Sequence, residues 1–296
     1  MRIAVTGQAG QVVTSLVERG NAAGHVVIAI GRPELDLADP ASVVRALEAA
    51  APDAIVSAAA YTAVDKAETE SELAYAVNGA GAGAVAQAAS ALDVPLVHVS
   101  TDYVFDGLAG RPYGESDPTG PTGVYGASKL AGEQAVLATH GNNSAIVRVA
   151  WVYSPFGANF VKTMLRLAAD RDEVSVVADQ VGNPTCALDI ADGILSIASN
   201  LVCDSNPALR GVFHMTAQGE ANWADFAEAI FAASAKRGGP WASVRRIGTA
   251  DYPTPATRPA NSRLDCGLIA RVHGVALQNW HGSLDLVIAR LITAAN

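Results

Sequence analysis

The first half of the chain alternates short apolar runs with helix-like segments, and this alternation limits the folds open to it. Strand-like runs occupy residues 2–6, 26–30, 54–58, 95–100 and 145–151. Segments with helical periodicity occupy residues 11–19, 40–51, 71–92 and 125–139. A strand followed by a helix and another strand predicts a parallel sheet with helices on both faces. The expected fold class is therefore α/β, with a Rossmann-type doubly wound parallel sheet.

The pattern changes after the fifth run. Helices are expected at 159–169, 187–199 and 222–235, a strand at 174–177 and a proline-rich loop at 252–259. We expect a dinucleotide-binding domain at residues 1–152 and a smaller, interleaved substrate-binding lobe at residues 153–296. Segments near 184–202 are expected to return to the Rossmann domain.

Composition and charge exclude several classes of protein. The 296 residues are 50% hydrophobic, which is enough for a sizeable buried core, and the net charge of −9 argues against non-specific nucleic-acid binding. We see no run of membrane-spanning length and no signal peptide, so we expect a cytoplasmic protein without membrane contact. Three scattered cysteines fit neither a disulfide framework nor a zinc site, and we expect no metal. Lys162 and Arg258 are candidate cations for an anionic substrate.

The turn after the first strand contains glycines at positions 7 and 10. Gly7 and Gly10 would let the backbone approach a pyrophosphate, whose charge the N-terminus of the next helix would stabilise. Gln11 and Val12 open that helix and belong to the same expected cofactor site. On its own, the motif is equally compatible with a purely structural turn. Val13 occupies the position of the usual third glycine.

The end of the second strand bears on the choice of cofactor. It carries Arg32 where a carboxylate would hold an adenosine ribose, which favours NADPH, with NADH as the alternative. Asp36 and Leu37 follow and could flank the adenine. The third strand is followed by three small residues, Ala58, Ala59 and Ala60. They permit close passage of a cofactor, although strand packing explains them nearly as well.

Tyr125 and Lys129 stand four residues apart in an expected helix and so share one face. A cation beside a tyrosine would lower the pKa of the phenol, which could then give a proton to a carbonyl oxygen as hydride arrives. Thr101, at the end of the fourth strand, could donate a second hydrogen bond to that oxygen. A Tyr–Lys pair alone also fits a solvated helix face; the glycine turn and Thr101 favour redox chemistry at a carbonyl.

Seven segments spread over nearly the whole chain are more specific than any glycine motif. They are AAAYTAVDKAE at 58–68, STDYVF at 100–105, VYGASKLAGE at 124–133, RVAWVY at 148–153, NFVKTMLR at 159–166, DQVGNPT at 179–185 and RPANS at 258–262. With them the chain resembles the extended short-chain dehydrogenase/reductase superfamily, and within it the dTDP-4-dehydrorhamnose reductases.

The resemblance implies roles for the matching residues. Tyr125 would be the proton donor, Lys129 would bind the nicotinamide ribose and lower the phenol pKa, and Thr101 would polarise the C4 carbonyl. The sugar pocket would be lined by Val64, Asp102, Tyr103 and Trp151. Val64 and Trp151 could instead be core residues, and Asp102 could cap a turn.

The implied reaction is the NADPH-dependent reduction of the C4 keto group of dTDP-4-dehydro-β-L-rhamnose to dTDP-β-L-rhamnose, the last step of dTDP-rhamnose biosynthesis. The implied partner is a nucleotide sugar, and the protein would be a monomer or a homodimer. Dehydratases of the superfamily commonly have Asp-Glu after the threonine, whereas Asp102 and Tyr103 follow it here, which favours a reductase. Two alternatives stay open: a ketoreductase for another 4-keto deoxysugar nucleotide, and a non-catalytic NADP-binding subunit resembling the methionine adenosyltransferase beta subunit.

The chain departs from the family pattern at a few positions. Val13 replaces a glycine, and Ser57 stands where the family tends to have Asn. Some family members are described with magnesium at a subunit contact that uses acidic side chains. Thr14 and Ser15 occupy the place where such a carboxylate would be sought, so we expect no metal-bridged dimer.

Overall fold

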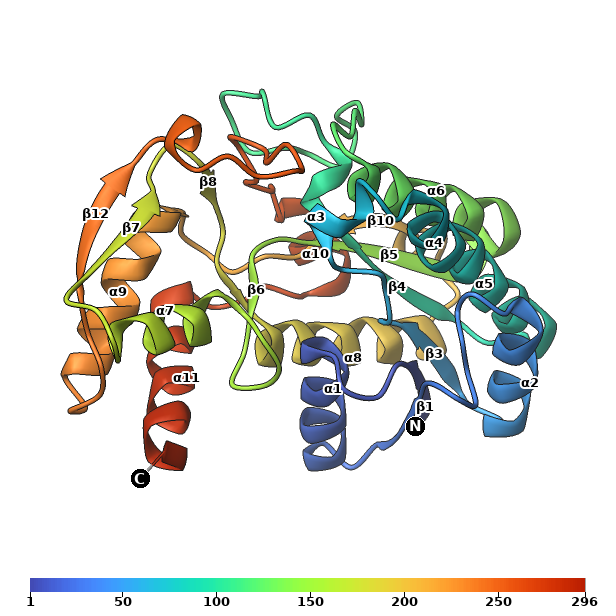
Figure 1. Cartoon of the computed structure of the whole chain (residues 1–296). Helices are drawn as coiled ribbons and strands as arrows, with labels where there is room; N and C mark the ends of the chain where they lie inside the picture. The colour runs from blue at the N-terminus through green and yellow to red at the C-terminus, as the bar shows by residue number, and fades with distance from the viewer. Residues whose placement is uncertain (296) are drawn as a thin grey trace.

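A six-stranded parallel sheet forms the centre of the computed structural model, which describes residues 1–295 (Figure 1). The strands are β1 (Arg2–Thr6), β2 (Val26–Ile30), β3 (Ala54–Ser57), β4 (Leu96–Thr101), β5 (Ser144–Val149) and β10 (Gly211–His214). They lie in the order β10-β5-β4-β3-β1-β2, and every pairing is parallel. The chain therefore changes direction across the sheet at β1, as in a doubly wound Rossmann-type fold, and the predicted fold class is confirmed.

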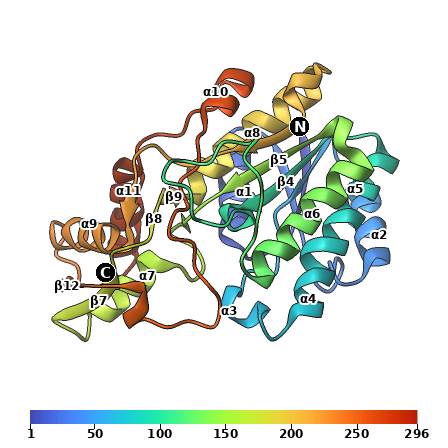
Figure 2. The ribbon, with the colours of Figure 1, turned by 90° about the horizontal axis from the view of Figure 1, so that it is seen from above.

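Helices cover both faces of the sheet (Figure 2). One face carries α1 (Gln11–Ala22) and α8 (Ala187–Cys203), and the other carries α2 (Pro40–Ala50), α5 (Gly81–Leu92) and α6 (Val124–His140). Side chains alternate along β1 accordingly: Ile3 and Val5 enter the core under α1 and α8, whereas Ala4 enters the core under α2 and α5. The strands are apolar on both sides because both sides are buried.

A smaller lobe with its own hydrophobic core lies beside the sheet (Figure 1). It contains α7 (Phe160–Ala168), α9 (Trp223–Ala235), α11 (Trp280–Ala295), β7 (Glu173–Val177) and β12 (Ser243–Ile247). Helix α9 begins at a capping box, in which the Asn222 side chain accepts from the backbone of Asp225 and the Asp225 carboxylate accepts in return. Short strands β6 (Val152–Tyr153), β8 (Val181–Gly182), β9 (Thr185–Cys186) and β11 (Ala221–Asn222) connect the lobe to the sheet region.

Several boundaries differ from the expected ones. The helix expected at 71–92 is divided into α4 (Ser71–Tyr75), a π-helical turn η1 (Ala76–Ala80) and α5. The strand expected at 145–151 ends at Val149, because Trp151 has a φ of 48° that no β-strand adopts. Both differences lie next to the cavity described below.

Two elements of the second half belong to the sheet region. Helix α8 packs on α1, and β10 pairs with β5 at the edge of the sheet. Helix α10 (Gly267–His273) contributes Ile269 to the same core. The division of the chain at residue 152 stays a prediction. Within residues 1–295, no helix has the length and apolar composition needed to cross a membrane.

Candidate functional site

A cavity of about 1050 Å³ opens where the carboxyl ends of the sheet strands meet the lobe. Its walls include the loops after β1, β2, β3, β4 and β5, the place where open α/β sheets bind ligands. Every residue to which the sequence assigned a cofactor-binding, sugar-pocket or catalytic role lines this one cavity. Of the two candidate cations, Arg258 lines it and Lys162 does not.

The glycine turn forms a cradle at one end of the cavity. Gly7 has a φ of 102°, and a Cβ on it would lie 3.2 Å from Val13 Cγ2 and 3.3 Å from Ala59 Cβ. Gly10 is the N-cap of α1, and no side chain caps the helix. The first amides of α1 can therefore point at a ligand, and backbone and helix terminus together fit a pyrophosphate. Val13 is buried against the turn and fills the place of the missing third glycine.

The far end of the cradle carries Arg32 and Asp36. Arg32 is exposed, and within residues 1–295 no carboxylate lies close enough to form an ion pair with it. Asp36 is half-buried, and its Oδ1 accepts from the backbone of Ala38 at 2.9 Å. Arg32 therefore places a positive charge without an ion-pair partner among residues 1–295 at this end of the cavity.

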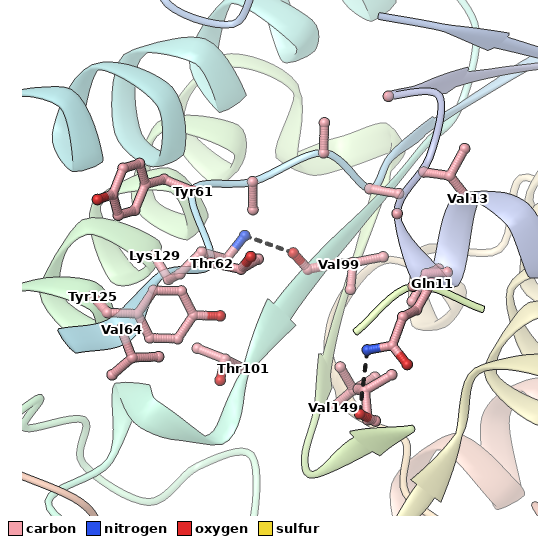
Figure 3. A pocket seen from close by; sticks show the side chains of 18 of the residues that line it. Gln11, Val13, Tyr61, Thr62, Val64, Val99, Thr101, Tyr125, Lys129 and Val149 are labelled. Carbon is pink, nitrogen blue, oxygen red and sulfur yellow. Dashed lines mark hydrogen bonds between the residues drawn. The ribbon is translucent and has the colours of Figure 1, made fainter. Parts of the chain in front are cut away.

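Helix α6 brings Tyr125 and Lys129 to the cavity on one face (Figure 3). The Tyr125 hydroxyl points toward Thr101, and the Lys129 ammonium donates to the Val99 carbonyl oxygen at 2.7 Å. A Cβ on Gly126 would lie 2.1 Å from the Tyr103 carbonyl oxygen, so glycine is required for this close approach of helix and loop. The three residues predicted as catalytic therefore converge from α6 and the end of β4.

The electrostatics of this group differ from the expectation. Burial raises the pKa of Tyr125 above its ordinary value, and the neighbouring Thr101 hydroxyl opposes this only in part. Burial also lowers the pKa of Lys129 to about 8, which the nearby Glu133 opposes. The predicted net lowering of the Tyr125 pKa toward neutral pH is not found, because desolvation of the phenol outweighs the effects that favour its ionised form. Tyr125 therefore keeps its proton at neutral pH.

Asp102 is a buried carboxyl group at the base of the cavity. Its Oδ1 accepts from the Thr101 hydroxyl at 3.0 Å, and its Oδ2 has no hydrogen-bond partner in the described part of the chain. Thr101, and not Asp102, caps the short 3₁₀ turn that follows β4, because the Thr101 oxygen accepts from the Tyr103 backbone. Burial raises the pKa of Asp102 from 3.8 to about 6.

Replacing Asp102 with Asn should therefore change how stability depends on pH. A raised carboxyl pKa makes the folded protein lose stability as pH rises from about 4 through 6, since the unfolded chain ionises first. The Asp102→Asn variant lacks this loss, so the difference in free energy of unfolding, variant minus wild type, should be about 2 kcal/mol more positive at pH 7.5 than at pH 4.5, which means a relatively more stable variant at the higher pH. Urea unfolding at both pH values measures the difference. An equal effect at the two values would contradict the assignment.

The Trp151 ring packs closely against its neighbours at the lobe side of the cavity. Its ring stacks on Trp223 with centroids 3.5 Å apart and planes inclined by 8°, and Trp223 Nε1 donates to Gln180 Oε1 at 3.2 Å. A Cβ on Gly182 would lie 2.5 Å from Trp151 Cε2, so Gly182 also packs closely against this ring. Trp151 is half-buried and faces the cavity, so it is not simply a core residue. Val64 is likewise half-buried at the cavity wall.

Sequence reasoning missed the lobe's contribution to the cavity. Trp223, Phe160 and Phe226 line it from α9 and α7, and the Phe160 and Trp223 rings lie 4.6 Å apart. Trp223 and Phe226 belong to the expected helix at 222–235, whose periodicity gave no sign that one face meets a cavity. Gly182 lies in the DQVGNPT segment at 179–185, but only its contact with Trp151 shows why this position must be glycine.

Two residues, Gln11 and Arg258, make polar contacts between the lobe and the sheet region around the cavity. Gln11 Oε1 accepts from Ser154 Oγ at 2.8 Å and from Asn159 Nδ2 at 3.0 Å. Arg258 Nη2 lies 2.8 Å from Asp65 Oδ2, and its Nη1 lies 3.4 Å from the Tyr103 hydroxyl. Arg258 thus brings positive charge to the substrate side, partly balanced by Asp65.

Comparison with known proteins places the chain in one family. Residues 1–293 match the family model described as RmlD substrate binding domain. The chain is 49% identical over 293 residues to a dTDP-4-dehydrorhamnose reductase of Sinorhizobium fredii, covering 99% of this chain and 98% of the relative. It is 43% identical over 299 residues to one of Burkholderia thailandensis, covering 99% and 100% of the two chains.

Solved structures of dTDP-4-dehydrorhamnose reductases are also similar to this chain. A dTDP-4-dehydrorhamnose reductase from Clostridium acetobutylicum superposes with a TM-score of 0.91 at 35% identity, covering 99% of this chain and 100% of that one. A dTDP-4-dehydrorhamnose reductase from Bacillus anthracis, solved in complex with NADP, superposes with a TM-score of 0.88 at 35% identity, covering 98% and 99%. A dTDP-glucose 4,6-dehydratase from Streptomyces venezuelae, at 22% identity and a TM-score of 0.77, shares the fold.

Proposed function

The chain belongs to the dTDP-4-dehydrorhamnose reductase family, and we infer from this that it reduces the C4 keto group of dTDP-4-dehydro-β-L-rhamnose to give dTDP-β-L-rhamnose, with NADPH as the reductant. This is the last step of dTDP-rhamnose biosynthesis. The observation that carries the inference is the convergence of Thr101, Tyr125 and Lys129 in one cavity with a glycine cradle. The proposed acid and the glycine cradle thus line the same cavity.

We propose that Tyr125 donates the proton that the product hydroxyl requires. When bound, NADPH supplies the hydride that adds to C4. The C4 oxygen gains negative charge as this happens, and the protonated phenol of Tyr125 transfers its proton to that oxygen. Thr101 turns its one hydroxyl hydrogen from Asp102 Oδ1 to the same oxygen, and the positive charge of Lys129 in the same cavity stabilises the tyrosinate left behind. One hydride and one proton convert the ketone to the alcohol, so the reaction balances.

The remaining cavity residues would bind the two ligands. For the cofactor we propose the cradle, the adenosine end and the small residues after β3: Gly7, Gly10, Gln11, Val12, Arg32, Asp36, Leu37, Ala58, Ala59 and Ala60. For the sugar nucleotide we propose Val64, Asp102, Tyr103, Trp151 and Arg258. Stacked Trp151 and Trp223 give this end of the cavity a rigid apolar wall.

Arg32 is expected to set the preference for NADPH over NADH. An unpaired guanidinium can bind a 2′-phosphate through two charge-assisted hydrogen bonds, which are worth roughly 1.5–3 kcal/mol each. The Arg32→Ala variant should raise the KM for NADPH about tenfold or more and leave the KM for NADH within about twofold. Steady-state kinetics with both cofactors measures this ratio. Parallel increases in the KM values for NADPH and NADH would show that Arg32 does not recognise the 2′-phosphate of NADPH.

Activity against a panel of 4-keto nucleotide sugars tests the proposed function. We expect oxidation of NADPH with dTDP-4-dehydro-β-L-rhamnose, and a higher kcat/KM for it than for the other 4-keto sugars. A clear preference for another sugar would support the alternative ketoreductase. Tight binding of NADP with no oxidation of NADPH by any substrate would support the non-catalytic regulatory subunit.

We also propose that the protein acts in the cytoplasm as a monomer or homodimer. We further propose that residues 1–152 form the dinucleotide-binding domain and that residues 153–296 form the lobe. The packing of α8 on α1 supports the return of segments near 184–202 to the Rossmann domain.

A further inference from the structure

Three buried polar side chains form a row behind the cavity. Ser57 on β3 and His98 on β4 are paired in register, and Ser57 Oγ lies 3.0 Å from His98 Nδ1. His98 Nε2 lies 3.5 Å from the Nζ atom of Lys129, which reaches down from α6. The exposed fractions of Ser57, His98 and Lys129 are 2%, 1% and 3%. Lys129 also lines the cavity, whereas Ser57 and His98 do not.

The contacts of His98 with Ser57 and Lys129 determine which of its two ring nitrogens carries the hydrogen. An ammonium group only donates hydrogen bonds, so Nε2 of His98 must be the acceptor and Nδ1 must carry the hydrogen. Ser57 Oγ accepts that hydrogen. Burial, together with the charge of Lys129, lowers the pKa of His98 well below its ordinary value. The ring is therefore neutral at physiological pH, and its Nε2 lone pair faces Lys129.

The row also determines where the Lys129 ammonium can point. Lysine has three donor hydrogens on a long, flexible stem, and holding it in one direction requires acceptors. The Val99 carbonyl oxygen at 2.7 Å accepts one hydrogen, and His98 Nε2 faces a second. The third remains for a ligand in the cavity. Ser57 stands where the family tends to have Asn, and both side chains offer an oxygen to the Nδ1 hydrogen.

We propose that His98, with its tautomer set by Ser57, is a positioning residue that holds Lys129 so that one donor faces the nicotinamide ribose. The proposal rests on the proposed function, in which Lys129 binds that ribose. It assigns a role in cofactor binding and turnover to two residues that do not line the cavity. Their effect must then pass entirely through Lys129.

Substitutions of His98 that keep or remove the acceptor test this role. His98→Leu is expected to lower kcat and weaken NADPH binding about tenfold, the size of one hydrogen bond to a charged group, with the KM for the sugar nucleotide unchanged. His98→Gln should restore most of kcat and most of the NADPH affinity, because the glutamine side-chain oxygen can reach the position of Nε2. His98→Asn, which reaches only toward Ser57, should not. If Gln is no better than Leu, the acceptor is not what matters and the proposal fails.

A double-mutant cycle with Lys129→Met separates positioning from general destabilisation. The Kd for NADPH is read from fluorescence titration without sugar nucleotide, so the cycle is informative even if the proposed substrate is wrong. His98→Leu should add no further loss once Lys129 is Met. Full additivity of the two losses would overturn the proposal. Failure of the proposed function appears differently, as wild-type protein that binds NADPH but does not oxidise it with the sugar.

Two further variants complete the test. His140 is a second buried histidine, at the end of the helix that carries Lys129, and its Nε2 bonds the Val94 carbonyl oxygen at 2.9 Å. His140→Leu removes a comparable contact and should leave kcat and the NADPH Kd unchanged, even if it lowers the melting temperature. If His98→Leu does not fold, Ser57→Ala serves instead and should weaken NADPH binding severalfold. An NADPH Kd equal to that of wild type in Ser57→Ala would contradict the role of Ser57.

Discussion

Replacing Tyr125 with phenylalanine is expected to lower the rate of ketone reduction by about 10²–10⁴-fold, the usual contribution of a general acid. The substitution removes the proton that the C4 oxygen must receive and leaves every other group in place. Because burial raises the pKa of Tyr125, wild type should keep this proton throughout the neutral range. Its activity should therefore show no loss that can be attributed to ionisation of the phenol below about pH 9. Single-turnover oxidation of bound NADPH measures the chemical step.

The phenylalanine ring should preserve the packing at this position. The rings of Tyr125 and Tyr103 meet edge to face with centroids 5.4 Å apart, a contact that does not need the hydroxyl. NADPH affinity and melting temperature should therefore match those of wild type. A Tyr125→Phe protein that reduces the ketone within about threefold of the wild-type rate would show that another group is the acid.

Replacing Glu133 with Gln is expected to destabilise the fold by about 3–5 kcal/mol, because it leaves a buried arginine unpaired. Arg148 donates from Nε to Glu133 Oε1 at 2.9 Å and from Nη2 to Oε2 at 2.6 Å, and the two side chains are 5% and 2% exposed. Ser100 also donates to Glu133 Oε1, at 2.5 Å. The pair ties α6, which carries Tyr125, to β5. Urea unfolding at pH 7 measures the loss.

A double variant distinguishes the cost of leaving a buried charge unpaired from the cost of losing the ion-pair contact itself. Glu133→Leu combined with Arg148→Met removes both charges and keeps the volume, so it should recover at least half of the stability lost by Glu133→Gln. Arg148 also lies over the Phe105 ring at 5.0 Å, and a methionine can keep that apolar contact. A loss of less than about 1 kcal/mol in Glu133→Gln, or a double variant no more stable than the single one, would contradict this account.

Strands β1 to β5 of the sheet were predictable because each is an apolar run between recognisable turns. Strand β10 was missed because it has only four residues, of which Val212 and Phe213 are its only apolar ones. The boundary after β5 was misplaced because the positive φ of Trp151 cannot be inferred from residue type. The sequence also concealed η1, because η1 and α5 consist largely of Ala and Gly and so have no distinct apolar stripe in which the one-residue shift of a π-helical turn would be visible.

The π-helical turn has a visible consequence for the site. It contains Asn78, which accepts from the Tyr61 backbone at 2.8 Å and donates to Ser128 Oγ at 3.0 Å. Ser128 is the neighbour of Lys129, so Asn78 ties the loop after β3 to the catalytic stretch of α6. Such turns recur at functional sites. No single residue in the sequence marks this one.

The site residues near the strand ends were predictable, and their energetics were not. The order of the glycine turn, Thr101 and Tyr125 along the chain already indicates a shared site, because carboxyl ends of parallel strands meet at one edge. The direction of the Tyr125 pKa depends on how deeply the lobe and loop bury the phenol, and that is a property of the fold. Trp223 could not be assigned because it reaches the cavity only through tertiary packing of the lobe.

The transfer of deuterium tests the central claim most directly. NADPH carrying deuterium at both C4 positions of the nicotinamide is incubated with the protein and dTDP-4-dehydro-β-L-rhamnose, and the product is analysed by NMR and mass spectrometry. We predict dTDP-β-L-rhamnose with one deuterium at C4 of the sugar. Recovery of the unreduced ketone, or a product with no deuterium at C4, would contradict the assignment of this chain as the reductase.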